Sequence, residues 1–206
     1  TLRLLVQGRR PRPGAHHRRA PSAGRWQSVV CIASGPSLTA DDCEKARAWR
    51  QQADGRAVIV TNTTFQLCPW ADALYAMDRA WWNKHRSQVG AVFRGECLTS
   101  AKNVPGAKTV IFRYGGNSGA GAISLAEHFG ARRIILLGYD CQYTGGKAHW
   151  HGDHPNGLGN AVSLPKWQGQ FSEMAGHLAH CQIINCSRHT ALPFWPRQRL
   201  EDALCQ

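Results

Sequence analysis

The chain has 206 residues, 43% of them hydrophobic, and a formal net charge of +12 at pH 7. This length and hydrophobic content predict one domain with a substantial core and exclude global disorder. No apolar run approaches the roughly 20 residues that a membrane span needs. Residues 4–6 form too short an apolar run, too close to Arg9 and Arg10, for the core of a signal peptide.

The cysteines and the charge distribution indicate the cellular compartment and the kind of partner. Eight cysteines are scattered along the chain without a Cys-x-x-Cys pair, a pattern typical of free thiols in the reducing cytoplasm. Residues 1–25 hold seven arginines and no acidic residue. We expect this segment to be a basic flexible arm that contacts a polyanion such as nucleic acid. A solvated extension without a partner is the alternative, since the arm lacks interleaved aromatic residues.

From residue 26 onward, strand and helix patterns alternate, which predicts a parallel sheet with helices on both faces. The expected strands cover residues 28–33, 57–61, 72–77, 91–94, 109–113, 133–137 and 182–185. The expected helices cover residues 38–53, 79–85, 118–129 and 166–180, with a last helix beginning at Pro196. Residues 143–164 read as a Gly-rich polar loop. The predicted fold class is a single α/β, Rossmann-like, doubly wound domain over residues 26–206.

A Gly-rich turn follows the first expected strand, in the sequence Ser34-Gly-Pro-Ser-Leu38. Gly35 would let the backbone approach a ligand closely, and Ser37 could cap the following helix or bind a phosphate or a sugar hydroxyl. The turn is neither the Gly-x-Gly-x-x-Gly of dinucleotide sites nor a P-loop. A purely structural turn with a serine cap remains open.

Further polar residues follow other expected strands. Asn62, Asp78 and Asp140 each come at a strand's carboxyl end, and Ser118 and Gly119 begin a helix. These positions meet at one edge of a parallel sheet, where ligands bind and helix N-termini favour phosphate. The pattern predicts a nucleotide-type ligand. Turn initiation at Asn62 and helix capping at Asp78 are the alternatives.

The densest group of potential ligands is His149-Trp-His-Gly-Asp-His154. Its spacing matches the His-x-His-x-Asp-His of zinc hydrolases, so His149, His151, Asp153 and His154 could hold a divalent metal. The position late in the chain fits that class poorly. The same imidazoles suit general acid/base catalysis, and a solvated loop is also open. We expect His154, by preference over His151, to face the nucleotide site.

Taken in order, these residues resemble one group of proteins. The segments 32–38, 118–119, 138–140 and 184–187, with Asn62 and the histidine loop between them, are similar to the bacterial sialyltransferases that use CMP-sialic acid. They are equally similar to the superfamily that contains archaeal 6-hydroxymethylpterin diphosphokinase and flagellin-glycosylation motility factors. Small phage-encoded proteins with a His-Trp-His-Gly-Asp-His-Pro loop also look similar. The likeness covers residues 28–204.

This resemblance implies a nucleotide-dependent transferase with a Rossmann-like fold. The nucleotide would contact Gly35, Ser37, Asn62, Asp78, Ser118 and Gly119, with Asp140 at the same edge and Tyr143 in the place of a phosphate-binding tyrosine. His151 or His154 would be the base that deprotonates an acceptor hydroxyl. The donor would be a nucleotide or nucleotide sugar, with no further cofactor firmly implied. A phage-encoded protein would act in the host cytoplasm.

Two alternatives follow from the same residues. A diphosphokinase acting on a small heterocycle would need a magnesium–triphosphate site, for which Asp78, Asp140 and Asp153 are the carboxylates available. A phage accessory protein or nucleic-acid-associated protein could keep the fold without catalysis. The basic arm favours this alternative.

Overall fold

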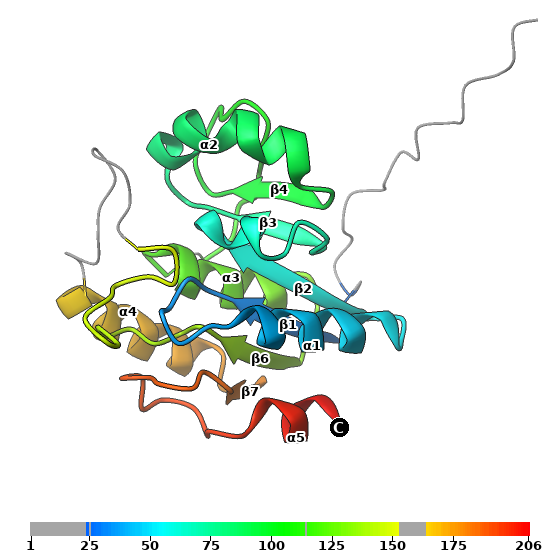
Figure 1. Ribbon diagram of the computed structural model, residues 1–206, viewed down its shortest axis with the longest axis vertical. Helices are drawn as coiled ribbons and strands as arrows, with labels where there is room; N and C mark the ends of the chain where they lie inside the picture. The colour runs from blue at the N-terminus through cyan, green and yellow to red at the C-terminus, as the bar shows by residue number, and fades with distance from the viewer. Residues whose placement is uncertain (1–23, 25, 114, 153–163) are drawn as a thin grey trace, which may run out of the picture.

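A seven-stranded parallel sheet runs through the part of the chain that the computed structural model describes, which is residue 24 and residues 26–113, 115–152 and 164–206 (Figure 1). Its strand order is β5-β4-β3-β2-β1-β6-β7. All six strand pairings are parallel. The predicted α/β fold is therefore confirmed.

The helices and strands alternate along the chain as the patterns indicated. The strands are β1 (Ser28–Ile32), β2 (Arg56–Thr61), β3 (Ala73–Tyr75), β4 (Glu96–Thr99), β5 (Lys108–Thr109), β6 (Arg133–Leu137) and β7 (Gln182–Asn185). The helices are α1 (Ala40–Gln51), α2 (Arg79–Val92), α3 (Ser118–His128), α4 (Leu164–His177) and α5 (Leu200–Leu204), with a 3₁₀ helix η1 (Asn62–Gln66). None of the helices in these described ranges is long and apolar enough to cross a membrane.

The chain reverses its direction of winding at β1. It builds β1 to β5 outward in one direction and then returns to place β6 and β7 on the other side of β1. Ser28 therefore pairs with Arg56 of β2 on one side and with Arg133 of β6 on the other. The reversal leaves a crevice outside the carboxyl ends of β1 and β6.

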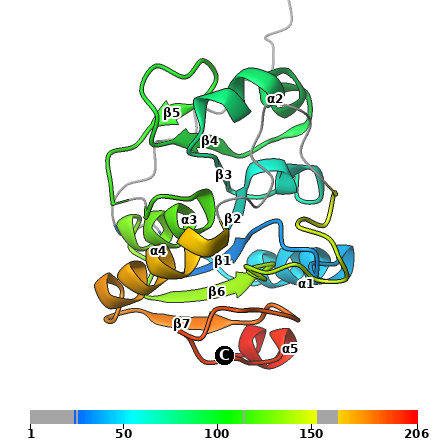
Figure 2. The ribbon, with the colours of Figure 1, turned by 90° about the vertical axis from the view of Figure 1, so that its left-hand side faces the viewer.

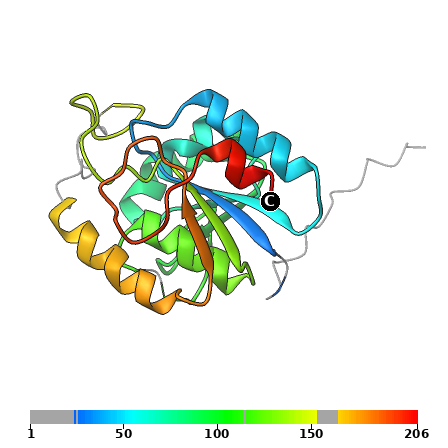
Figure 3. The ribbon, with the colours of Figure 1, turned by 90° about the horizontal axis from the view of Figure 1, so that it is seen from below.

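Two hydrophobic cores fill the two faces of the sheet. In β1, Val29 and Cys31 pack with α3 and α4, whereas Val30 and Ile32 pack with α1, α2 and α5, because successive side chains of a strand point to opposite faces. Figures 2 and 3 show α3 and α4 on one side of the sheet and α1 and α5 on the other. Burial on both faces explains the continuous apolar sequence of β1.

Several predicted boundaries are wrong. The expected strand over residues 91–94 does not form, because α2 continues to Val92 and keeps Trp81, Trp82 and Val89 on its buried side. The strand expected over 109–113 is the short edge strand β5, after which the chain leaves the sheet and Ile111 is 92% exposed.

Two further differences concern local elements. The last helix begins at Leu200 rather than at Pro196, whose carbonyl oxygen accepts a hydrogen bond from the backbone N–H of Asn185 instead. The 3₁₀ helix after β2 was not predicted. The basic arm lies outside the described residues except for Gly24, so the predicted division at residue 25 stays a prediction.

A glycine in α3 tests the close packing of this helix on the sheet. A Cβ atom added at Gly121 would lie 2.4 Å from Cε1 of Tyr75, which is fully buried in β3. We expect Gly121→Ala to lower the free energy of unfolding by about 1–3 kcal/mol, as overpacking does. Urea denaturation measures this.

The matched control is Gly176→Ala in α4, where a Cβ would meet no atom within 4 Å. Removing an exposed helical glycine should raise stability by about 0.5–1 kcal/mol. Equal stability of Gly121→Ala and the unmodified protein would contradict the packing described.

Candidate functional site

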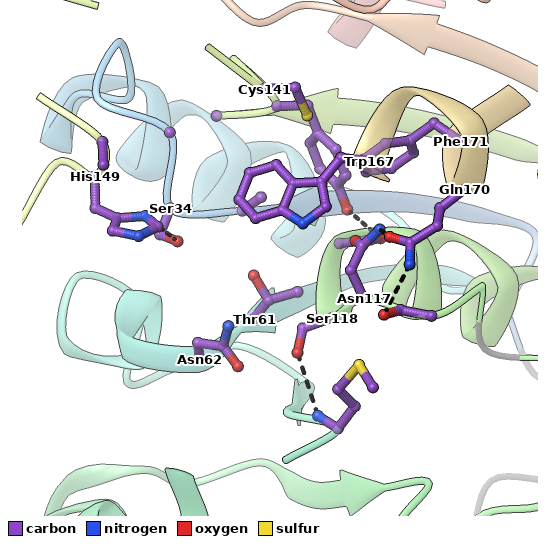
Figure 4. Close-up of a pocket in the computed structure, with 18 of the residues that line it drawn as sticks. Ser34, Thr61, Asn62, Asn117, Ser118, Cys141, His149, Trp167, Gln170 and Phe171 are labelled. Atoms are coloured by element: carbon purple, nitrogen blue, oxygen red, sulfur yellow. Dashed lines mark hydrogen bonds between the residues drawn. The ribbon is translucent and has the colours of Figure 1, made fainter. Parts of the chain in front are cut away.

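A cavity of about 470 Å³ opens at the carboxyl edge of the sheet. Its walls come from the segments that follow β1, β2, β3 and β6, from the first turn of α3, and from α4 (Figure 4). It therefore lies at the reversal between β1 and β6, where ligands of open α/β sheets bind.

One side of the cavity is the turn after β1, which lies directly against the end of β6. The backbone N–H of Gly35 donates to the carbonyl oxygen of Gly138 at 2.8 Å. A Cβ at Gly35 would come within 2.2 Å of a carboxylate oxygen of Asp140 and 2.4 Å of that same carbonyl. This close approach to the end of β6 requires glycine at position 35, whereas the close approach to a ligand expected from the sequence stays a prediction.

Ser37 and Asp140 are bonded to each other behind this turn. The Asp140 carboxylate accepts hydrogen bonds from the Ser37 backbone N–H at 2.9 Å, from the Ser37 hydroxyl at 2.7 Å and from the Thr144 hydroxyl at 2.9 Å. Asp140 is only 1% exposed. Ser37 and Asp140 are not among the described residues that line the cavity, so in this structure the pair holds the turn in place.

The amino end of α3 forms another side. Asn117 caps the helix, its Oδ1 accepting from the Ala120 N–H at 2.9 Å. The Ser118 hydroxyl accepts from the Met77 N–H at 3.2 Å, which ties the helix to the segment after β3. Ser118 and Gly119 both line the cavity, and N–H groups of a first helical turn have no partner within the helix. This end of α3 therefore favours a negatively charged ligand group.

Two hydrogen-bond acceptors, Asn62 and Asp78, also line the cavity. Asn62 has a φ of 47°, in the left-handed region that asparagine tolerates. Its Oδ1 is buried and finds no hydrogen-bond partner in the part of the chain that the structure describes. Asp78 precedes α2 without capping it, and burial raises the pKa of its carboxyl. Both side chains can accept hydrogen bonds from a ligand.

The histidine loop contributes one described side chain to the cavity. The His149 ring is 7% exposed, and its Nδ1 lies 3.4 Å from the Ser34 hydroxyl. His151 stacks on His149, with ring centroids 5.1 Å apart and planes at 7°, but it is not among the described residues that line the cavity. The sequence indicated His149 as a possible metal ligand and as one of the imidazoles suited to acid/base catalysis, but the base preferred there was His154 or His151.

The other two members of the predicted metal set, Asp153 and His154, lie outside the described residues. The expectation that His154 faces the site therefore stays a prediction. Across the described ranges, no three histidine, cysteine or acidic side chains are grouped to hold a metal ion. Tyr143, expected to contact phosphate, is 59% exposed and does not line the cavity as described.

Helix α4 supplies a wall that the sequence did not reveal. Lys166, Trp167, Gln170 and Phe171 all line the cavity, and their spacing puts them on one side of a helix. The sequence of this helix is amphipathic. That pattern indicates that one side of the helix is shielded from water, but it does not distinguish a core from a ligand cavity.

Comparison with known proteins gives a match in structure but none in sequence. No family model matches the chain, and no curated protein matches it either. The structure is, however, similar to a solved protein structure. This is the MAf glycosyltransferase from Magnetospirillum magneticum AMB-1, with a TM-score of 0.58 and 15% identity over 87% of this chain. The present chain corresponds to 35% of that protein's length. At this identity the likeness shows a shared fold.

The Asp78 carboxyl, which is partly desolvated although the residue is exposed, predicts a pH-dependent effect on stability. Its pKa is raised on folding because burial disfavours the charged form, so stability is lost as the pH rises through the folded pKa. We expect Asp78→Asn to raise the melting temperature at pH 7. The difference should vanish below about pH 3, where the carboxyl is protonated in both states.

Asp54→Asn, at an exposed position, is the control and should change little at either pH. A lower melting temperature for Asp78→Asn at pH 7 would show that the carboxylate has a stabilising partner instead.

The bonds between Ser37 and Asp140 predict a structural role for the carboxylate. Asp140→Asn leaves one oxygen for three donors, so we expect a loss of about 2 kcal/mol in the free energy of unfolding. Thr144→Val removes only one of the three bonds and should cost less. Urea denaturation of both variants checks the order, and an equal cost would contradict it.

Proposed function

We propose that this protein is a nucleotide-dependent transferase, similar to glycosyltransferases, whose crevice takes a nucleotide-activated sugar donor. The observation that carries the proposal is the make-up of the crevice, which joins the amino end of a helix to the buried, unpartnered Oδ1 of Asn62 at the reversal of the sheet. The shared fold with a protein named as a glycosyltransferase supports it.

The polar groups that line the crevice suit the two ends of a nucleotide. Phosphate oxygens would accept hydrogen bonds from the N–H groups of Ser118 and Gly119. Lys166, which also lines the cavity, adds a positive charge. The Oδ1 of Asn62 would accept from an amino or hydroxyl group of the base or ribose, and Asp78 would accept from a hydroxyl of the sugar.

In the proposed transfer, a histidine of the loop takes the proton of the acceptor hydroxyl. The acceptor oxygen forms a bond to the anomeric carbon as the bond from that carbon to the phosphate oxygen breaks, and the nucleotide leaves with the electron pair. The resemblance implies His154 or His151 for this base. His149 is the histidine whose described ring lines the crevice, and the Ser34 hydroxyl lies near its Nδ1.

A thermal-shift screen tests the proposal, using nucleoside mono-, di- and triphosphates and nucleotide sugars, each with and without Mg²⁺. A rise in melting temperature with a nucleotide sugar, independent of Mg²⁺, supports the transferase. A rise that needs both a triphosphate and Mg²⁺ would favour the diphosphokinase. No shift with any of these compounds would contradict a nucleotide site.

Asn62 allows a sharper test, because glycine can adopt its left-handed backbone without strain. Asn62→Gly should bind the nucleotide identified in the screen roughly 5- to 10-fold more weakly, as expected for losing one hydrogen bond. Its melting temperature without ligand should change little, since Oδ1 has no hydrogen-bond partner among the described residues. Titration calorimetry measures the affinity.

The matched control is Asn103→Gly, which also replaces an asparagine with positive φ but is exposed and does not line the described cavity. Equal affinities for Asn62→Gly and Asn103→Gly would contradict the role proposed for Asn62.

A further inference from the structure

The indole of Trp167 projects into the cavity from α4. Figure 4 shows it between Ser34 and His149 on one side and Asn117 and Gln170 on the other. The residue is partly buried. Its ring makes no aromatic contact or hydrogen bond with any residue that the structure describes.

The helix that carries this indole is firmly attached to the cavity wall. Gln170 accepts a hydrogen bond from Asn117 at 2.7 Å and donates to the Gly116 carbonyl at 3.3 Å. Phe171 is 2% exposed and packs edge-on against Tyr139, with ring centroids 6.0 Å apart. Trp167 lies one turn before these anchors, so its backbone is fixed while its ring faces the cavity.

A ring in this position is suited to stacking. An indole has two large apolar faces, and covering such a face removes apolar area from water. Any nucleobase offers a flat face to stack against it. Lys166, the preceding residue, and the amino end of α3 lie along the same cavity and suit the phosphate of the same ligand.

We propose that Trp167 stacks on the nucleobase of the bound nucleotide, an inference that rests on the proposed function. It makes α4 the element that recognises the aromatic end of the donor, whereas α3 recognises its phosphate. The ligand class is thereby narrowed to compounds that carry a planar base, and sugar phosphates without a base would bind without this contact.

Titration calorimetry with CMP, UMP, AMP, GMP and ribose 5-phosphate tests the inference on the full chain. For the tightest-binding nucleotide, we expect Trp167→Ala to weaken affinity roughly 5- to 100-fold, the range observed for loss of a base–aromatic stack. Trp167→Phe keeps a ring and should retain most of the affinity. The affinity for ribose 5-phosphate should be the same in all three proteins.

Fluorescence gives a second readout. The nucleotide should quench the tryptophan emission of the unmodified protein and quench Trp167→Phe much less, although that variant still binds. Trp70→Ala is the control, since it removes another partly buried indole that is not among the described residues lining the cavity. It should bind as the unmodified protein does.

The outcomes separate the two proposals. If a nucleotide binds and Asn62→Gly weakens it while Trp167→Ala does not, the stacking role is wrong and the proposed function stands. If Trp167→Ala weakens ribose 5-phosphate equally, the indole contacts the sugar and the inference is also overturned. If no nucleotide binds the unmodified protein, both proposals fail.

Discussion

The carboxylate of Asp140 joins two parts of the chain that are 103 residues apart in sequence. It closes the end of β6 onto the turn after β1 by accepting from both the backbone and the side chain of Ser37. These two strands flank the reversal of the sheet, so this contact sets the distance across which the crevice opens. This contact also requires glycine at position 35, because no side chain fits between the turn after β1 and the end of β6.

The remaining walls are tied to this frame by polar contacts of the same kind. Ser118 joins α3 to the segment after β3, and Asn117 joins α3 to Gln170 of α4. With these groups used to hold the walls, Asn62, Asp78 and Trp167 are among the side chains that line the cavity without a hydrogen bond to another described side chain. A rigid frame that presents a few uncommitted groups is the arrangement expected of a preorganised binding site.

The fold could be predicted because apolar strands and amphipathic helices leave hydrophobic patterns in short stretches of sequence, and these patterns can be recognised in one sequence alone. The sequence also predicted that Gly35, Asn62, Asp78, Ser118 and Gly119 would meet, since strand carboxyl ends share one edge of a parallel sheet. The sequence could not show that Ser37 and Asp140 would bond to each other. The direction of a side chain in a turn depends on the groups that the folded chain brings next to it, and these two residues are far apart in sequence. The contribution of α4 was hidden for a similar reason, since Trp167 looks like any other apolar position of an amphipathic helix.

The central claim is that the crevice between β1 and β6 binds a nucleotide. Its most direct measurement is a nucleotide titration followed by backbone amide chemical shifts in ¹H–¹⁵N NMR spectra. A second cavity is lined by Arg188 and Arg197, away from this crevice. We predict the largest shifts at Gly35, Asn62, Ser118 and Gly119, and small ones at this second cavity. Shifts confined to that second cavity, or none at millimolar nucleotide, would contradict it.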